Sequence, residues 1–200
     1  MKLAVLVSGT GTNLQALLDA ERRGALAPGE IACVVSNRPG VRALDRAELA
    51  RKPAAVVDHT AFPTREAFED AVAEVLDAHG VEAVVLAGFM RMLTPRFLAR
   101  YPDRIINIHP SLLPAFPGVN AQKQALDFGV RVTGATVHFV SPEMDGGAII
   151  LQAAVAVFED DTVEELRDRI LVEEHWLLPR ATQLLCAGKL VREGRRVRIR

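Results

Sequence analysis

The alternation of apolar runs with helical patterns over residues 1–128 restricts the fold more than any other feature. Runs typical of buried strands occur at residues 2–7, 31–37, 54–57, 81–87 and 104–109. Stretches with apolar side chains at helical spacing separate these runs. Parallel strands need crossover connections, and helical crossovers cover the faces of a sheet. The pattern therefore predicts an α/β fold, a Rossmann-like, mostly parallel twisted sheet with helices on both faces.

The last third of the chain has a different pattern. Apolar and polar residues alternate over 133–140, a tight turn follows at 141–147, and a second run covers 148–157. This predicts a half-buried strand in a hairpin, and hence a mixed sheet. A helix is expected from about residue 161 towards Pro179, with a second helical stretch to about residue 187. Residues 190–199 are expected to form a C-terminal antiparallel hairpin extension, whose arginines we interpret as charged strand edges rather than as a nucleic-acid site.

Composition limits the class of protein. Half of the 200 residues are hydrophobic, so one domain spanning residues 1–200 can bury a core of its own. The formal net charge of −1 gives no argument for binding nucleic acid or an anionic membrane. The two cysteines, Cys33 and Cys186, are too few for a disulfide framework. Without a signal peptide or a run of about 20 apolar residues, we expect a cytoplasmic protein.

A glycine-containing loop joins the first strand to the first helix. Residues 8–13 read Ser-Gly-Thr-Gly-Thr-Asn, and a loop of this kind directs backbone N–H groups and a helix N-terminus at an anion. A dinucleotide fingerprint would need a third glycine where Leu14 stands, and a Walker loop would need Gly-Lys-Ser/Thr. The loop is interpreted as a cradle for a single phosphate, with a plain tight connection as the alternative. Thr10 or Thr12 is expected to cap the helix.

Two polar side chains are expected at the carboxyl end of the fifth strand. Asn107 and His109 are two residues apart, so they emerge on the same side of that strand, and Pro110 ends it. Ligands bind at this edge of open α/β sheets. Asp145, in a glycine-rich turn, is the best acidic candidate to reach them. A carboxylate favours a protonated imidazole, and an amide with such an imidazole would stabilise an oxyanion, which suits acyl transfer without a covalent enzyme intermediate.

The sequence contains no motif for a metal site or for a serine hydrolase. None of the five histidines has ligand spacing with a second His or Cys on one element, so no metal site is predicted. The Gly-x-Ser-x-Gly motif of serine hydrolases is absent at the strand-to-helix turns.

The motifs resemble those of a known family. Residues 107–114 (Asn-Ile-His-Pro-Ser-Leu-Leu-Pro) with residues 145–147 (Asp-Gly-Gly) are similar to the signature of folate-dependent formyltransferases. Residues 8–13, residues 86–91 and the pair Glu174-His175 narrow the resemblance, which covers essentially the whole chain, to members that formylate phosphoribosylglycinamide in purine synthesis.

The resemblance implies an activity and roles for particular residues. The co-substrate would be 10-formyltetrahydrofolate, and the acceptor the amine of 5-phosphoribosylglycinamide. Residues 1–110 would form a phosphate-binding α/β half and residues 111–200 a folate-side half. Asn107 would bind the formyl oxygen, His109 would act as acid and proton shuttle, and Asp145 would raise the His109 pKa. The implied binding residues are Gly11, Thr12 and Asn13 for the phosphate, Glu174 for the glycinamide substrate, and Arg65, Met90, Arg91, Met92 and Leu93, with Asn107, for the folate.

The chain departs from the family pattern at peripheral positions. Ala115 and Pro117 stand where a basic residue is common, and Leu171 stands where a polar residue on the phosphate side can occur. Two alternatives stay open, a 10-formyltetrahydrofolate hydrolase and a non-catalytic module that binds a phosphorylated metabolite. The expected partners are small-molecule substrates, without nucleic acid or a membrane. A homodimer is possible, and the sequence leaves the oligomeric state open.

Overall fold

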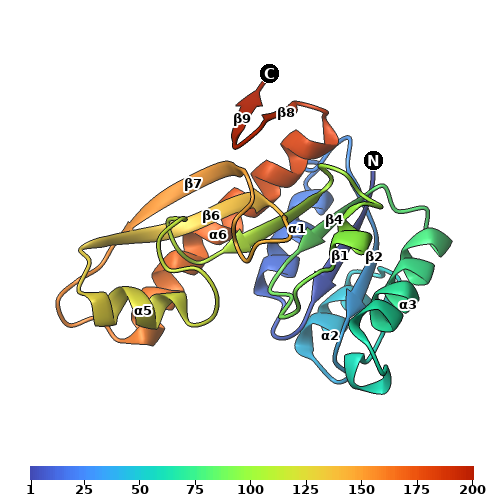
Figure 1. The fold of residues 1–200 in the computed structure, drawn as a ribbon, viewed down its shortest axis with the longest axis horizontal. Helices are drawn as coiled ribbons and strands as arrows, with labels where there is room; N and C mark the ends of the chain where they lie inside the picture. Colours follow the sequence, from blue (N-terminus) through green and yellow to red (C-terminus); the bar gives the residue numbers. More distant parts are fainter.

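The structure, a computed structural model, describes residues 1–200. A seven-stranded sheet with the order β3-β2-β1-β4-β5-β6-β7 forms its centre. Its strands are β1 (Lys2–Val7), β2 (Glu30–Ser36), β3 (Ala54–Val56), β4 (Ala83–Leu86), β5 (Ile105–His109), β6 (Val132–Phe139) and β7 (Ile149–Ala156). The first five strands are parallel, whereas β6 and β7 run antiparallel to their neighbours. The predicted fold class is confirmed (Figure 1).

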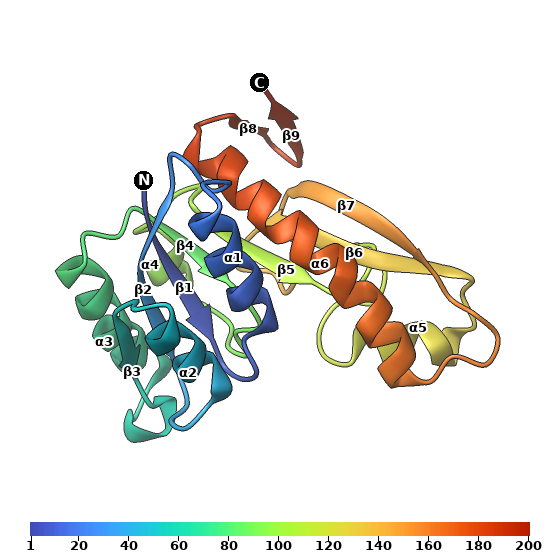
Figure 2. The same cartoon turned by 180° about the vertical axis from the view of Figure 1, so that it is seen from behind.

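Helices cover both faces of the sheet (Figures 1 and 2). Leu3 and Val5 of β1 belong to a larger core, while Ala4 and Leu6 face a smaller one, as side chains alternate along a strand. The larger core includes residues of α1 (Thr12–Arg22), α2 (Arg42–Leu49) and α6 (Val163–Cys186). The smaller core includes residues of α3 (Arg65–Ala78) and α4 (Pro95–Leu98). The helical turn η1 (His59–Ala61) precedes α3.

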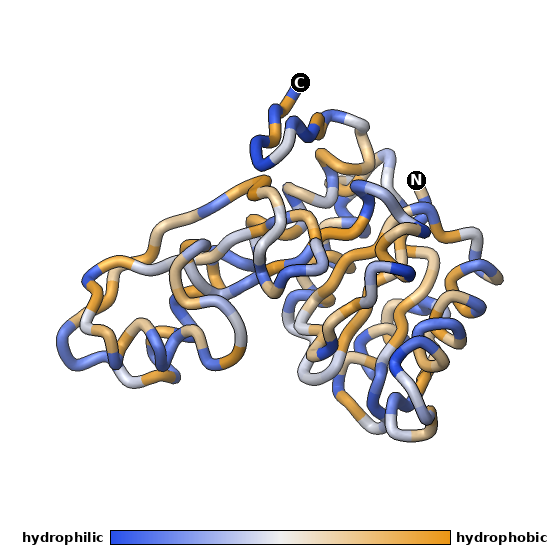
Figure 3. Tube along the Cα trace, in the orientation of Figure 1, coloured by the Kyte–Doolittle hydropathy of each residue, from blue (hydrophilic) through white to orange (hydrophobic).

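The second half of the chain makes the molecule elongated. The strands β6 and β7, the helix α5 (Ala121–Phe128) and the start of α6 extend away from β1–β4 (Figure 1). At the other end of α6, β8 (Leu190–Glu193) and β9 (Arg196–Ile199) form a separate hairpin, as predicted. An ion pair of 2.6 Å between Arg192 and Asp103 ties this hairpin to the turn before β5. Figure 3 shows hydrophobic residues along the central strands and hydrophilic residues at the outer turns.

Three local predictions were wrong. All residues of β6 after Val132 are buried, not half-buried, because α6 packs on this strand while the loop after β5 also contacts it. The helix α6 is continuous through Pro179, since buried Leu177, Leu178 and Ala181 hold both sides of the proline in the core. Leu49, which its helical spacing with Leu44 and Ala47 predicts to face inward, is exposed at the end of α2.

Candidate active site

The carboxyl end of β5 carries Asn107 and His109. His109 is buried, whereas Asn107 is partly exposed. The neighbouring strand β6 pairs antiparallel with β5, and the register sets Asn107 opposite His138 and His109 opposite Thr136. The two strands thus bring a second imidazole to the site. Sequence reasoning missed His138 as a functional residue, because alternation gives its face on β6 but not which strand lies next to β6.

Asp145 reaches this cluster from the turn between β6 and β7. Its Oδ2 lies 3.3 Å from Nδ1 of His109, and its Oδ1 lies 3.6 Å from Nε2 of His138. The backbone N–H of Gly118 donates to Oδ2 at 2.7 Å, which links the turn to the loop after β5. A Cβ atom on Gly147 would lie 1.6 Å from the carbonyl oxygen of Phe139, so only glycine allows this approach.

The surroundings of His109 act on its protonation in opposite directions. Nε2 lies 2.9 Å from the carbonyl oxygen of Phe116, and Nδ1 faces Asp145, so both ring nitrogens face acceptors. Burial lowers the His109 pKa and is the largest influence. The Phe116 contact and the charge of Asp145 raise this pKa, while His138 lowers it. The charge of Asp145 thus acts in the expected direction, but burial outweighs it, and the His109 pKa lies below its usual value.

His138 fixes the amide of Asn107. Its Nδ1 lies 2.9 Å from the carbonyl oxygen of Phe139, and its Nε2 lies 3.2 Å from Nδ2 of Asn107. A neutral ring that donates from Nδ1 to Phe139 must accept at Nε2, and the Asn107 amide is the donor it faces. Since Nδ2 carries two hydrogens, the other one stays free for a ligand.

The glycine loop leads into α1 without a side-chain cap. Gly11 occupies the N-cap position with φ of 71°, so the expected cap from Thr10 or Thr12 is wrong. A Cβ atom on Gly11 would lie 2.7 Å from the Cβ of Ala43, which shows how closely α2 packs against the loop. Beside the first turn of α1 lies an open cavity of about 320 Å³. Its lining residues are Thr12, Gln15, Ala16, Asp19, Arg23, Arg46 and His175.

Asn13 and Glu174 meet although 161 residues separate them in the sequence. Nδ2 of Asn13 donates to Oε2 of Glu174 at 2.7 Å, and both residues are buried. Burial raises the pKa of Glu174 to about 7, against a smaller lowering effect of the Asn13 hydrogen bond. Oδ1 of Asn13 has no hydrogen-bond partner. Hence the Asn13 side chain turns towards α6 and leaves a buried acceptor unsatisfied beside a carboxyl group that titrates near neutral pH.

The segment after β4 holds four of the predicted folate residues. Met90 is 63% exposed, Arg91 and Met92 are partly exposed, and Leu93 is buried. The backbone N–H of Met90 donates to the hydroxyl of Ser8 at 2.8 Å, so this segment contacts the glycine loop. Arg65 stands at the start of α3 and forms no hydrogen bond or ion pair with this segment.

Two further observations concern the class of protein. No group of three or more His, Cys, Asp or Glu side chains is placed to hold a metal ion. None of the helices combines the length and the apolar character needed to cross a membrane.

Comparisons with known proteins give the chain a set of relatives. The family described as formyl transferase matches residues 1–182. The chain is 43% identical to the phosphoribosylglycinamide formyltransferase of Haemophilus influenzae, with 94% of this chain and 89% of the relative covered. It is 50% identical to the trifunctional purine biosynthetic protein adenosine-3 of Gallus gallus over 94% of its own length, but spans only 19% of that protein. The solved structure of glycinamide ribonucleotide transformylase 1 from Symbiobacterium toebii superposes with a TM-score of 0.97 at 55% identity, covering 100% of this chain and 93% of the other.

Proposed function

The chain belongs to the formyl transferase family, and we propose that it transfers the formyl group of 10-formyltetrahydrofolate to the amine of 5-phosphoribosylglycinamide in purine biosynthesis. The observation that carries this proposal is the cluster of Asn107, His109 and Asp145. An amide N–H, an imidazole and a carboxylate converge there at the carboxyl edge of the sheet. Such a set can stabilise an oxyanion and move a proton, the two needs of acyl transfer to an amine.

The proposed reaction is a direct transfer. The neutral amine attacks the formyl carbon on N10 of the folate, and the carbonyl electrons move onto oxygen. The free N–H of Asn107 and a protonated His109 stabilise this oxyanion. Collapse of the intermediate breaks the bond between carbon and N10, and the proton lost by the amine reaches N10 through His109. Products are the formylated acceptor and tetrahydrofolate.

A protonated His109 can stabilise the oxyanion only if one of its N–H groups becomes available to the substrate. Both of its ring nitrogens face oxygen acceptors, and the protonated ring satisfies both at once. The Nε2 contact with the Phe116 carbonyl must exchange for a substrate oxygen, since one N–H cannot serve both fully. Asp145 would keep the ring oriented during this exchange, because its carboxylate also accepts from Gly118.

Two regions would bind the substrates on either side of this centre. Residues 1–110 would supply the phosphate cradle at Gly11, Thr12 and Asn13, supported by the N-terminus of α1. The unsatisfied Oδ1 of Asn13 and the carboxyl of Glu174 offer acceptors to N–H or O–H donors of the ribosyl glycinamide. The exposed Met90 and its neighbours Arg91 and Met92 would border the folate.

The remaining parts of the proposal follow from this assignment. The folate is a co-substrate and the reaction uses no metal. Residues 111–200 would complete the folate side, and the protein would work in the cytoplasm as a one-carbon transferase without nucleic-acid partners. Arg65 forms no hydrogen bond or ion pair with residues 90–93, so in this proposal it would reach the folate directly.

One assay tests the activity against both alternatives. Enzyme and 10-formyltetrahydrofolate are mixed with and without phosphoribosylglycinamide, and the folate absorbance is followed. A transferase turns over only with both substrates. Turnover with the folate alone indicates a hydrolase, and no turnover in either mixture indicates a binding module. Either of these two results contradicts the proposal.

A further inference from the structure

The segment between β4 and α4 is irregular, yet its backbone is anchored at three points. Residues 87–94 belong to no helix or strand. The N–H of Ala87 donates to the carbonyl oxygen of Leu6, that of Met90 to the Ser8 hydroxyl, and that of Thr94 to a carboxylate oxygen of Glu69 at 2.7 Å. The last two anchors are side chains from other elements. The conformation of this segment therefore depends on residues outside it.

Glu69 provides the anchor next to α4. It lies on α3, and its residue surface is 3% exposed. One carboxylate oxygen accepts from the backbone of Thr94, and the other accepts from the Thr94 hydroxyl. That hydroxyl in turn accepts from the N–H of Phe97 and so caps α4. A single buried carboxylate thus fixes both the end of the irregular segment and the start of the helix.

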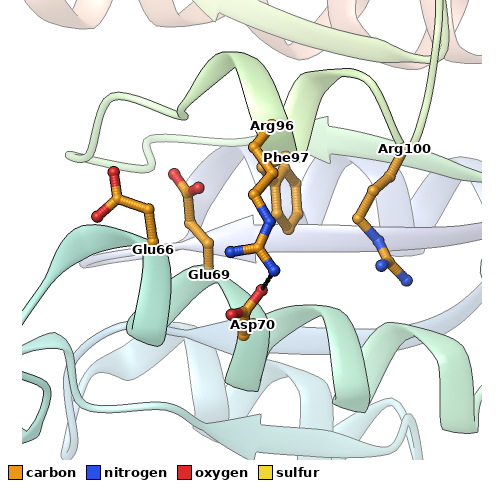
Figure 4. Close-up of a pocket in the computed structure, with 6 residues that line it drawn as sticks. All are labelled: Glu66, Glu69, Asp70, Arg96, Phe97 and Arg100. Atoms are coloured by element: carbon orange, nitrogen blue, oxygen red, sulfur yellow. Dashed lines mark ion pairs between the residues drawn. The ribbon is translucent and has the colours of Figure 1, made fainter.

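Two exposed ion pairs also join α3 to the α4 region and can be compared with the buried contact of Glu69. Arg96 pairs with Asp70 at 2.8 Å, and Arg100 pairs with Asp77 at 2.6 Å. The side chains of the first pair are 66% and 53% exposed. Figure 4 shows Glu69 and Asp70 side by side on α3, with Arg96 above them and the dashed line marking its ion pair. Exposed pairs of this kind contribute little, whereas losing one partner of a buried carboxylate leaves polar groups unsatisfied.

We propose that Glu69 is a positioning residue for the folate side of the site, acting through Thr94 on Met90, Arg91 and Met92. This inference rests on the proposed function, which places the folate beside these residues. Glu69 is buried and both of its carboxylate oxygens bond Thr94, so its effect on the folate would pass through Thr94. Its carboxylate holds the segment in the binding conformation before the folate arrives, so the folate does not have to order it.

The test compares Glu69→Ala with Asp70→Ala, the adjacent position on the same helix. Michaelis constants for 10-formyltetrahydrofolate and for phosphoribosylglycinamide are measured separately. Glu69→Ala is expected to raise the folate constant about tenfold, the usual effect of losing a hydrogen bond to a charged group. The phosphoribosylglycinamide constant should change less than about twofold, and Asp70→Ala should leave both unchanged. Glu69→Gln, which keeps one acceptor, should fall between wild type and Glu69→Ala.

Further measurements distinguish an effect of each substitution on folding from an effect on folate binding. Circular dichroism and thermal melting show whether each variant folds, and Thr94→Val and Glu69→Gln carry the same test if Glu69→Ala does not fold. A folded variant with an unchanged folate constant, or with both constants raised equally, overturns the inference. If wild type itself shows no transfer, the proposed function fails. Calorimetric binding of tetrahydrofolate to wild type and Glu69→Ala then decides the role of Glu69 by itself.

Discussion

The side-chain amide of Asn107 has two N–H groups, and their partners determine whether it can donate to a substrate. One N–H of Nδ2 faces His138, and the second is free. His109 offers the other donor, since its ring lies between Asp145 and the Phe116 carbonyl. Removal of either donor should leave binding of the phosphate intact and slow the transfer. We expect Asn107→Ala and His109→Ala each to lower kcat about 10²–10³-fold, the usual cost of one oxyanion donor. Steady-state kinetics with both substrates measure this, and near-normal kcat in both variants would refute the assignment.

His138 contacts the amide of Asn107 through its Nε2, and we expect this contact to orient Asn107. His138→Ala removes the acceptor that holds the amide, so Asn107 can rotate away from the reacting oxygen. We expect kcat to fall about tenfold, as for a lost hydrogen bond of roughly 1.4 kcal/mol, with little change in either Michaelis constant. His79→Ala, at the C-cap of α3, serves as the matched control because the His79 imidazole contacts only the Val75 carbonyl oxygen. Equal kinetics of the two variants would exclude an orienting role for His138.

Asp145 should control the pH range of the reaction. Its charge raises the pKa of His109, while burial lowers it. Asp145→Asn removes the charge and leaves the burial, so the His109 pKa should fall further. If protonated His109 is the acid, activity declines as pH rises through that pKa. The descending limb of the pH–rate profile should therefore move to lower pH in Asp145→Asn. A limb that stays in place would show that His109 is not the titrating acid.

At the scale of helices and strands, the local sequence predicts some helix ends correctly and others not. Residues 64–67 (Thr-Arg-Glu-Ala) resemble an N-terminal capping turn, and in the structure the Thr64 hydroxyl does accept from the N–H of Ala67 at 3.1 Å at the start of α3. Capping is local, so a pattern of four residues is enough to find it. The continuity of α6 through Pro179 is not local, because burial on both sides of the proline decides it. The missing cap of α1 has a similar cause, since the N-cap position falls on Gly11, which the packing of α2 requires, and not on Thr10 or Thr12.

The Thr64 cap allows a test at this scale. Thr64→Ala should lower the free energy of unfolding by about 1 kcal/mol, because the N–H of Ala67 loses its partner. Thr64→Ser keeps the hydroxyl and should keep nearly all of the stability. Denaturant unfolding monitored by circular dichroism measures both. A loss in Thr64→Ser as large as in Thr64→Ala would mean that the methyl group, not the cap, provides the stabilisation.

The arrangement of the whole molecule determines which residues far apart in the sequence make contact. The sequence predicts these contacts less well than it predicts single helices and strands. The alternation of strands and helices predicts the parallel part of the sheet, and the apolar runs predict much of the core. The strand order places β5 between β4 and β6, and only this order brings His138 to Asn107. The contact of Asn13 with Glu174 likewise depends on α6 lying beside α1. Residue types near a strand end can predict a site, but pairs joined across the fold need the three-dimensional arrangement.

The burial of Glu174 makes the stability of the protein depend on pH. The Glu174 pKa is raised from 4.5 to about 7 in the folded state because the carboxyl is buried. Between these two values the unfolded chain has released a proton that the folded chain still holds, so stability falls as pH rises. The full difference corresponds to about 3 kcal/mol. The site thus retains a buried carboxyl group at the expense of stability near and above neutral pH.

Replacement of Glu174 by glutamine should remove this dependence. Near pH 5 the wild-type carboxyl is largely protonated in the folded state, so Glu174→Gln and wild type should differ little. At pH 8 the variant should be more stable by up to about 3 kcal/mol, while its Michaelis constant for phosphoribosylglycinamide rises. Chemical unfolding at the two pH values measures the effect, with Glu173→Gln as the partly exposed neighbouring control. If the stability difference between Glu174→Gln and wild type is the same at both pH values, Glu174 does not titrate between them. A carboxyl that costs stability and binds no substrate would have no functional reason to be there, so a combined gain in stability and loss of affinity would indicate that the fold retains Glu174 for binding.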